Sequence, residues 1–146
     1  MRTHSQRRAD AIRRLESEPN VWIATASAGG VPHLVPLSLA WDGTRILVAT
    51  PTSTPTARNA AEAGVVRASL DDADDVVLID ATVEVVDFAA ADRALIDVYV
   101  QRVGWNPADE SGDWSLLVVA PTTIRSWNGI DETTGRVIMK RGDWLD

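Results

Sequence analysis

The stretch "VWIATASAGGVPHLVPLSLAW", residues 21–41, decides the fold. Two apolar runs, Val21–Ala28 and Val31–Trp41, stand on either side of the pair Gly29-Gly30. Glycine reaches the positive φ angles of tight hairpin turns, so two glycines between strand-like runs predict a β-hairpin. The second run alternates, which places these residues on one face of the expected strand: Val31, His33, Val35, Leu37, Leu39 and Trp41.

Pro32 and Pro36 interrupt the second run of this hairpin. Proline has no N–H to donate to a neighbouring strand, so it is confined mainly to edge strands or bulges. We therefore expect the second strand to be unpaired on one side near these prolines.

The rest of the chain continues with short strands and tight turns. Asp42-Gly43 predicts a second turn, which leads into a third strand over residues 45–50. Further strands are expected over residues 65–70, 76–86, 114–121 and 122–127, the last two separated at Pro121. Helices are expected over residues 5–17 with Ser5 as the cap, from Pro55 to Ala63, and from about Phe88 to Val103 with Asp87 as the cap; residues 104–112 are expected to form a loop.

Strands dominate this order and follow one another closely, which favours an antiparallel barrel or sandwich over an alternating βαβ sheet. The length of 146 residues fits one domain, residues 1–146. The chain is expected to be mainly β, with helices flanking the barrel.

Composition excludes several classes of function. The chain has no cysteine, which removes thiolate catalysis and zinc–cysteine sites. It has two histidines, His4 and His33, which argues against a multi-histidine metal site within one chain. The net charge of −7 argues against general nucleic-acid binding. No apolar block follows the N-terminal arginines, and the longest strongly apolar run is Leu116–Ala120, so we expect a cytoplasmic protein without a membrane span.

The segment "ATPTSTPTARNAAEAG", residues 49–64, concentrates five hydroxyl side chains before a helix. Pro55 is favoured at the first helical position, and Thr54 is a good cap before it. Arg58 then falls in the first turn, where the helix dipole disfavours a positive charge, and residues 43–61 contain no acidic residue. From the residues alone, two interpretations stay open: a capped helix after a polar loop, or an anion site at the helix start.

The stretches at residues 21–41 and 46–59, with the paired late strands, resemble the pyridoxamine 5′-phosphate oxidase-like split-barrel superfamily over nearly the whole chain. The most similar branch is the small flavin- or deazaflavin-dependent oxidoreductases of actinobacteria, many of which bind coenzyme F-420. The resemblance implies an antiparallel split β-barrel that forms a homodimer, with each cofactor in a groove between the two subunits.

The resemblance also implies which residues bind the cofactor. The loop after the third strand and the following helix start would hold the cofactor phosphate, and the second strand would lie beside the flavin ring. Arg125, on a late strand, would contact the cofactor across the interface. The implied cofactor-binding residues are Val35, Pro36, Leu37, Ser38, Thr50, Ser53, Thr54, Thr56, Arg58, Asn59 and Arg125; no catalytic residue is assigned and no metal is implied.

The chain departs from its relatives at several positions. Thr56 stands where many relatives have lysine, and Val35 and Ala40 stand where pyridoxamine phosphate oxidases use basic residues on FMN. These differences favour coenzyme F-420, with FMN as the alternative. The glutamate tail of coenzyme F-420 has a second candidate anchor in the arginine-rich start of the chain, whose alternative role is a solvated helix face: Arg2, Arg7, Arg8, Arg13 and Arg14.

Several other side chains have two interpretations. Trp22, Trp41 and Trp114 are expected in the core or at a dimer interface. Trp127 and Trp144 are candidates to cover a ring from the partner subunit. His33 is expected to be structural rather than a proton donor, and Tyr99 is expected to pack on its helix.

The expected function is therefore hydride transfer between bound coenzyme F-420 and a small unsaturated substrate. The cofactor carries such chemistry, which agrees with the lack of an obvious catalytic dyad. Two alternatives remain: the same barrel with FMN, and a flavin- or deazaflavin-binding protein without turnover.

Overall fold

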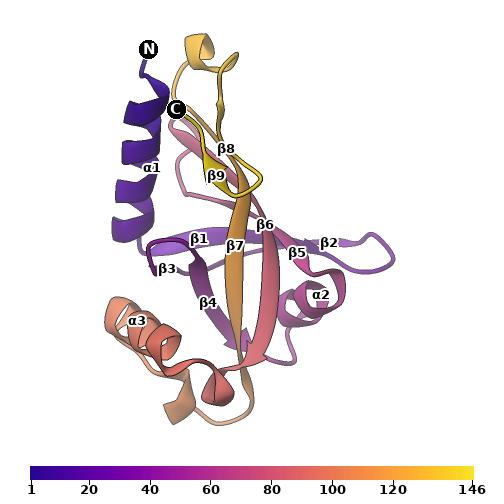
Figure 1. Cartoon of the computed structure of the whole chain (residues 1–146). Coiled ribbons are helices and arrows are strands. Elements are labelled where there is room, and N and C mark those ends of the chain that lie inside the picture. The colour runs from indigo at the N-terminus through magenta and orange to yellow at the C-terminus, as the bar shows by residue number, and fades with distance from the viewer.

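The computed structural model describes residues 1–146 and contains one antiparallel sheet of nine strands. The main hydrogen-bonded path runs β2-β1-β5-β6-β7-β4-β3, and a small hairpin of β8 and β9 extends from β7. Figure 1 shows the long strands β6 and β7 at the centre, with α1 at the upper left, α3 at the lower left and α2 at the lower right. The expected mainly β, antiparallel architecture with flanking helices is confirmed.

The N-terminal hairpin joins β1 (Asn20–Ala26) to β2 (Pro32–Ser38), in a register that pairs Ile23 with Val35. Gly30 sits in the connecting turn with a φ of 84°, a value that glycine adopts without strain. β2 pairs with β1 only, so its prolines lie on an edge strand as expected. The second run does not form one continuous strand, because β2 ends at Ser38 and Ala40–Trp41 form a separate strand, β3.

The next elements follow the sequence closely. β4 (Ile46–Pro51) leads into α2 (Pro55–Ala63), which Thr54 caps at its N-terminus and Gly64 ends in the left-handed conformation. β5 (Val65–Ser69) and β6 (Val76–Asp87) then form an antiparallel pair. The predicted boundaries of α2 are confirmed residue for residue, because its cap, its Pro55 and its terminal glycine are all local signals.

The two expected late strands are in fact one strand, β7 (Trp114–Trp127), so the predicted break at Pro121 is wrong. β4 pairs with β7 only as far as Val119, and β8 (Val137–Lys140) begins to pair at Ile124. Pro121 falls in the gap between these neighbours, so its missing N–H costs no ladder hydrogen bond there. Thr122 is the extra residue of a bulge opposite β6, where the register shifts between Asp80 and Ala81.

The predicted helix from Phe88 to Val103 is also wrong in its extent. A short 3₁₀ turn, η1 (Phe88–Ala90), comes first, and α3 (Arg93–Val103) starts only after Asp92, whose side chain accepts a hydrogen bond from the N–H of Ala94. Asp92 rather than Asp87 is therefore the cap of the helix. The loop that follows contains a second 3₁₀ turn, η2 (Pro107–Asp109).

The two chain ends meet beside the barrel. Helix α1 (His4–Ser17) is capped by Thr3, not Ser5: the Thr3 side chain accepts from the N–H of Gln6, and the Gln6 side chain accepts from the N–H of Thr3. A third 3₁₀ turn, η3 (Ile130–Glu132), leads into β8, and β9 (Asp143–Trp144) completes the C-terminal hairpin. His4 Nε2 lies 2.9 Å from the carbonyl oxygen of Gly135, which ties the helix to this C-terminal region.

The core has two parts on opposite faces of β4 and β7. Ile46, Val48, Leu117 and Val119 belong to a cluster of 20 buried residues inside the barrel. Leu47, Ala49, Leu116 and Val118 belong to a smaller cluster that also includes Ile96 and Tyr99 of α3. Both faces of these strands are thus covered, which explains why their sequences are continuous apolar runs rather than alternating ones.

The barrel is open between β2 and β4. β2 ends the hydrogen-bonded path on one side, and it lies against β4 without pairing with it. The edge of β2 and the C-terminal end of β4 therefore border a seam, and α2 begins just beyond β4.

Candidate functional site

The start of α2 is built from hydroxyl groups that position one another. The Thr54 hydroxyl accepts from the N–H of Ala57 at 3.3 Å and lies 3.0 Å from the Thr50 hydroxyl. The Thr52 hydroxyl lies 2.8 Å from that of Ser115 on β7, and the Thr52 N–H donates to the carbonyl oxygen of Asp113. The loop is therefore fixed to the barrel at both of its ends.

Several donors at the same place have no partner in the chain. The N–H groups of Ser53 and Thr56 are absent from the hydrogen-bond network. Thr56 lies in the first turn of α2, where N–H groups have no acceptor within the helix, and Ser53 lies just before the cap. The Thr56 side chain is only 2% exposed, yet its hydroxyl forms no hydrogen bond within the chain. Arg58 is exposed and forms no salt bridge with any carboxylate. These groups can all donate to an anion.

The charge around this helix start favours the same ligand. The first turn of α2 contains no acidic residue, and a helix N-terminus carries a partial positive charge. Arg58 adds a full positive charge there. An anion at this position would neutralise both, whereas without one the arginine opposes the helix dipole.

A hollow of about 380 Å³ opens beside this loop, at the seam between β2 and β4. None of its lining residues is charged, and three of them are aromatic. Such a mixture of apolar walls and a few polar groups is typical of small-molecule sites. The lining residues are Asn20, Pro36, Leu37, Ser38, Ala49, Thr50, Pro51, Tyr99, Trp105 and Trp114.

The structure brings most of the predicted site residues together. Thr50 lines the hollow and also contacts Thr54 at the helix start, so it connects the apolar hollow to the unpaired donors. Pro36, Leu37 and Ser38 of β2 line the same hollow, whereas Val35 does not. Asn59 lies on α2 but donates to the hydroxyl of Thr25 at 3.2 Å, on the barrel side of the helix.

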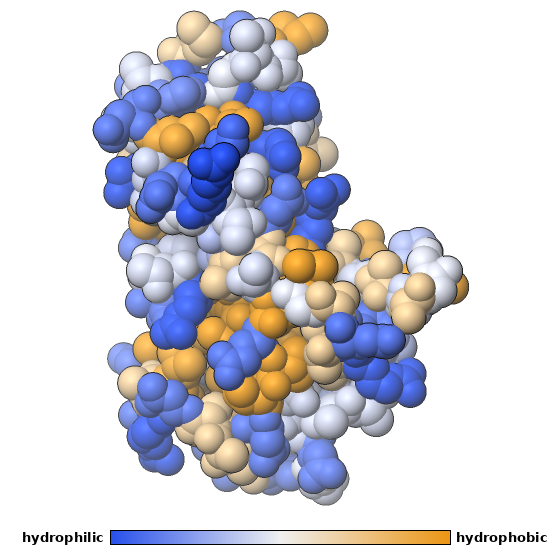
Figure 2. Space-filling view, turned by 45° about the vertical axis from the view of Figure 1, so that its right-hand side comes forward, coloured by the Kyte–Doolittle hydropathy of each residue, from blue (hydrophilic) through white to orange (hydrophobic).

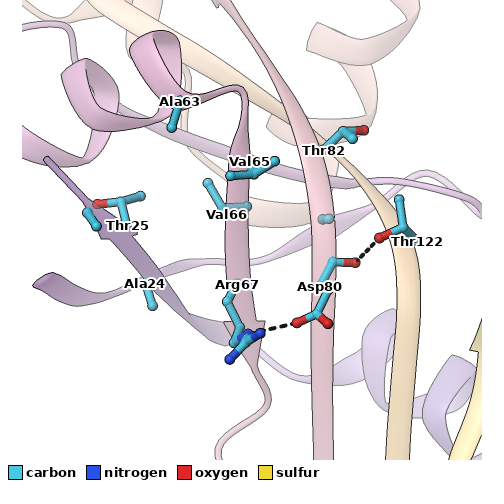
Figure 3. Close-up of a pocket in the computed structure, with 11 residues that line it drawn as sticks. Ala24, Thr25, Ala63, Val65, Val66, Arg67, Asp80, Thr82 and Thr122 are labelled. Carbon is cyan, nitrogen blue, oxygen red and sulfur yellow. Dashed lines mark hydrogen bonds and ion pairs between the residues drawn. The ribbon is translucent and has the colours of Figure 1, made fainter. Parts of the chain in front are cut away.

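Arg125 lies elsewhere within the chain. Its guanidinium donates to Asp80 at 3.0 Å, and Arg67 donates to the other oxygen of the same carboxylate at 2.7 Å. Burial alone would raise the pKa of Asp80, but the hydrogen bonds from Arg125 and Arg67 outweigh it and lower that pKa. Figure 3 shows Arg67 and Asp80 facing each other beside a second hollow, of about 460 Å³, between β1, β5, β6 and β7. Arg125 does not line the hollow at the seam.

The N-terminal arginines have partners within the chain. Arg2 contacts Glu132, Asp10 and Asp75, and Arg14 contacts Glu18 and Asp75. Arg7 is buried and donates to the carbonyl oxygens of Ser126 and Gly135, and Arg13 pairs with Asp10. Arg8 lies 5.2 Å from the ring of Trp144. Arg2, Arg7 and Arg8 thus contact the C-terminal region, whereas Arg13 stays exposed, so a second anchor for an acidic tail stays a prediction.

The tryptophans have different roles. Trp41 is buried in the barrel core, and Trp22 donates to Asp71 at the surface. Trp127 lies 5.5 Å from the guanidinium of Arg136, and Trp144 packs against the core. Trp105 and Trp114, by contrast, form an edge-to-face pair 5.0 Å apart beside the seam.

Sequence reasoning missed three aromatic residues of the hollow. Tyr99 was expected only to pack, and it does, but it also lines the hollow. Trp105 lies in a segment expected to be a plain loop, and Trp114 was expected in the core or an interface. The sequence offered one signal: Trp105 directly follows Gly104, the glycine that ends α3. An isolated aromatic residue in a polar loop often contacts a ligand or a partner.

Together these features define a class: an antiparallel split barrel in which an unpaired, cationic helix start adjoins an apolar hollow at the seam. The chain belongs to the pyridoxamine 5′-phosphate oxidase family, whose model matches residues 9–128. No curated protein matches the chain in sequence.

Solved structures with the same fold differ in what they are described to do. A candidate pyridoxamine 5′-phosphate oxidase from Listeria innocua superposes with a TM-score of 0.68 at 13% identity, over 83% of this chain and 98% of its own. An F-420 reductase superposes with a TM-score of 0.61 at 23% identity, over 77% of this chain and 93% of its own. The heme storage protein HutZ from Vibrio cholerae superposes with a TM-score of 0.63 at 15% identity, over 79% of this chain and 89% of its own. At these identities the likeness establishes the fold. None of the helices of the chain has the length and apolar character needed to span a membrane.

Proposed function

We propose that the chain is an oxidoreductase that binds a flavin-type cofactor at the seam, with coenzyme F-420 as the favoured one. The observation that carries the proposal is the set of unpaired donors at the start of α2, Ser53, Thr56 and Arg58, directly beside an uncharged hollow. A flavin-type cofactor combines a flat ring system with a phosphate. The uncharged hollow suits the ring system, and the unpaired donors suit the phosphate.

The residues at the start of α2 and on β2 suit the chemistry of a flavin-type cofactor. The N–H groups of Ser53 and Thr56, the Thr56 hydroxyl and the Arg58 guanidinium would hold the phosphate. Pro36, Leu37 and Ser38 of β2 would lie beside the ring, where the edge strand leaves its backbone free on one side. Val35 faces the half-buried side of β2 and would act only through packing.

The charge of the site favours coenzyme F-420 over FMN. Arg58 is the only cationic side chain at the helix start, and Thr56 offers a neutral hydroxyl. The terminal phosphate of FMN is a dianion, whereas the phosphodiester of coenzyme F-420 has a single negative charge. One arginine and several neutral donors match the single charge better.

When bound in its reduced form, coenzyme F-420 supplies a hydride to an unsaturated substrate. The chain contributes position, exclusion of water and hydrogen bonds. His33 is half-buried on β2 and does not line the hollow, so a required proton would come from solvent or from another donor at the seam.

Titration of the purified apoprotein with each cofactor tests this proposal. We expect coenzyme F-420 to bind more tightly than FMN, and its affinity to fall as salt screens the exposed Arg58 contact, over about 8–10 Å at moderate ionic strength. Fluorescence titration with matched buffers measures both affinities. Tight FMN binding with no measurable affinity for coenzyme F-420 would instead support the FMN-dependent alternative.

A binding protein without turnover is the other candidate, and the fold of HutZ makes it a concrete one. Turnover with the reduced cofactor and a panel of unsaturated acceptors separates the two. Binding of the cofactor without acceptor-dependent oxidation would favour storage or transport. Binding of heme in place of either cofactor would contradict the proposal of a flavin-type cofactor.

We also propose that the protein acts as a homodimer in which a second copy covers the seam. Val31, Leu34 and Val65 are large apolar residues that are more than half exposed. Val31 and Leu34 lie in the turn before β2 and on β2, and Val65 lies on β5, on the other side of β1. Figure 2 shows apolar side chains gathered at the surface of the lower half of the molecule. Exposed apolar patches of this kind commonly mark protein interfaces.

Light scattering at micromolar concentration should therefore give twice the monomer mass. A Leu34→Glu variant places a charge in the exposed apolar set and should shift the protein toward monomer without unfolding it. A wild-type monomer at these concentrations would refute the shared-site arrangement, but not cofactor binding by a single chain.

A further inference from the structure

A buried serine interrupts the apolar run at the start of β7. Leu117 and Val119 of this strand belong to the core inside the barrel. Side chains alternate along a strand, so Ser115 occupies the next position on the same face. Its side chain is only 3% exposed, at a place where burial favours an apolar residue. A hydroxyl group at such a position needs a hydrogen-bond partner within the protein.

That partner lies on the loop that leads into α2. The hydroxyl groups of Ser115 and Thr52 are 2.8 Å apart, and this is the only hydrogen bond that the Ser115 side chain makes. The N–H of Thr52 donates to the carbonyl oxygen of Asp113 at 2.9 Å. The start of β7 therefore holds Thr52 by its side chain, and the residue before β7 holds it by its main chain.

Thr52 is a central residue of a tight turn. The N–H of Thr54 donates to the carbonyl oxygen of Pro51 at 3.1 Å, which places Thr52 and Ser53 at the two central positions of a β-turn. The peptide group between these two residues carries the Ser53 N–H, one of the unpaired donors at the start of α2. The orientation of the turn thus sets the direction of this N–H, and Thr52 attaches the turn to β7.

The hydroxyl bond matters because little else holds this part of the loop. Thr52 is exposed, so packing contributes little to its position. A loop that is fixed before its ligand arrives binds more tightly, since binding then costs less conformational entropy. The bond between Ser115 and Thr52 supplies such a constraint, from a strand that is 63 residues away in the sequence.

We propose that Ser115 is a positioning residue for the anion site at the start of α2. Its hydroxyl holds Thr52, which orients the turn of residues 51–54, so that the Ser53 N–H is directed at the cofactor phosphate before the cofactor binds. Ser115 acts through Thr52 and does not itself hold the phosphate. The inference deepens the proposed function and rests on it, because it concerns the site assigned there to the phosphate.

Two pairs of ligands separate the phosphate from the ring system. Coenzyme F-420 is compared with the same deazaflavin without its phosphodiester tail, and FMN is compared with riboflavin. Fluorescence titration of the full-length protein gives the ratio of the two affinities within each pair. We expect the wild type to prefer the phosphate-bearing ligand, and Ser115→Ala to reduce this preference about two- to tenfold, the effect of one hydrogen bond. The phosphate-free ligands should bind both proteins equally.

Thr52→Val removes the same bond from the loop side. Valine has the shape of threonine and keeps the main-chain bond to Asp113, so a similar reduction is expected. A protein with both Ser115→Ala and Thr52→Val should lose no more than either single variant, because the two changes remove one shared hydrogen bond. Ser126→Ala is the matched control: Ser126 is another buried serine of β7, 1% exposed, and it should keep the wild-type preference.

Three results would contradict this inference. A wild-type preference in both Ser115→Ala and Thr52→Val would show that the bond does not position the anion site. An equal loss of affinity for both ligands of a pair would show a general change of the fold and would also overturn the positioning role. A wild type that prefers the phosphate-bearing ligand in neither pair would contradict the proposed phosphate site itself, and the role of Ser115 with it.

Discussion

Replacing Arg58 with alanine is expected to weaken cofactor binding by about 1.5–3 kcal/mol, which corresponds to roughly 10- to 150-fold in affinity. Arg58 is the one cationic side chain at the start of α2, and it makes no salt bridge that would compete for it. A phosphate at the helix start would therefore lose its only charge-assisted hydrogen bond from a side chain. Fluorescence titration of wild type and variant with coenzyme F-420 measures the change.

The same substitution should leave the fold intact. Removing a positive charge from the first turn of a helix relieves its opposition to the helix dipole, so the apoprotein should unfold at the same temperature or slightly higher. Arg93 provides a matched control, because it is an exposed arginine in the first turn of α3 and does not line the hollow. Arg93→Ala should bind the cofactor normally. Equal affinities in wild type and Arg58→Ala would mean that Arg58 only faces solvent.

Replacing Arg2 with alanine should have the largest effect on stability, a loss of about 3–5 kcal/mol in the free energy of unfolding. The Glu132 side chain is fully buried and accepts hydrogen bonds from the main-chain N–H, Nε and Nη2 of Arg2. Without the guanidinium, the buried Glu132 carboxylate loses its only salt-bridge partner. Denaturant unfolding at neutral pH measures the loss.

The pH dependence of stability should also depend on the pair of Arg2 and Glu132. The hydrogen bond from the Arg2 side chain is the main reason that the pKa of Glu132 falls from an ordinary 4.5 to about 2. Since the folded-state pKa lies below the unfolded-state value, the stabilisation is fully present above about pH 5 and is lost as the pH falls toward 2. Over that range it amounts to about 3 kcal/mol.

Wild type and Arg2→Ala should therefore converge in stability as the pH falls from 5 to 2. Arg13→Ala is the matched control, because Arg13 lies on the nearby helix α1 and pairs with Asp10 at the surface, where such pairs contribute about 0–1 kcal/mol. A pH-independent difference between wild type and Arg2→Ala would show that the effect comes from packing at the chain start and not from the charge of Glu132.

Several elements of this chain follow from short signals in the sequence. The Gly29-Gly30 turn, the edge prolines and the capped start of α2 each depend on residues within a few positions, and all three lie where they were expected. The first turn of α2, which contains no acidic residue, could be predicted for the same reason. A cap, a first-turn proline and a terminal glycine act through the local backbone, so no distant contact was needed to predict them.

The break at Pro121 and the contacts of the N-terminal arginines depend on distant neighbours. Pro121 ends a strand only if a neighbour requires its N–H, and the gap between β4 and β8 removes that requirement. The N-terminal arginines were free to bind an acidic tail in the sequence alone. Their carboxylate partners, Asp75 and Glu132, are far away along the chain, and only folding brings them together.

The sequence by itself determined the hairpins, the helix start and the absence of acid around it, because turn geometry, capping and local charge are properties of neighbouring residues. Only the tertiary structure decided that β2 and β4 leave a seam, and that Tyr99, Trp105 and Trp114 meet Pro36 and Thr50 across it. The physical reason is that a hollow lies between elements distant in sequence. Its lining depends on how α3 packs on β4, and no local pattern encodes that contact.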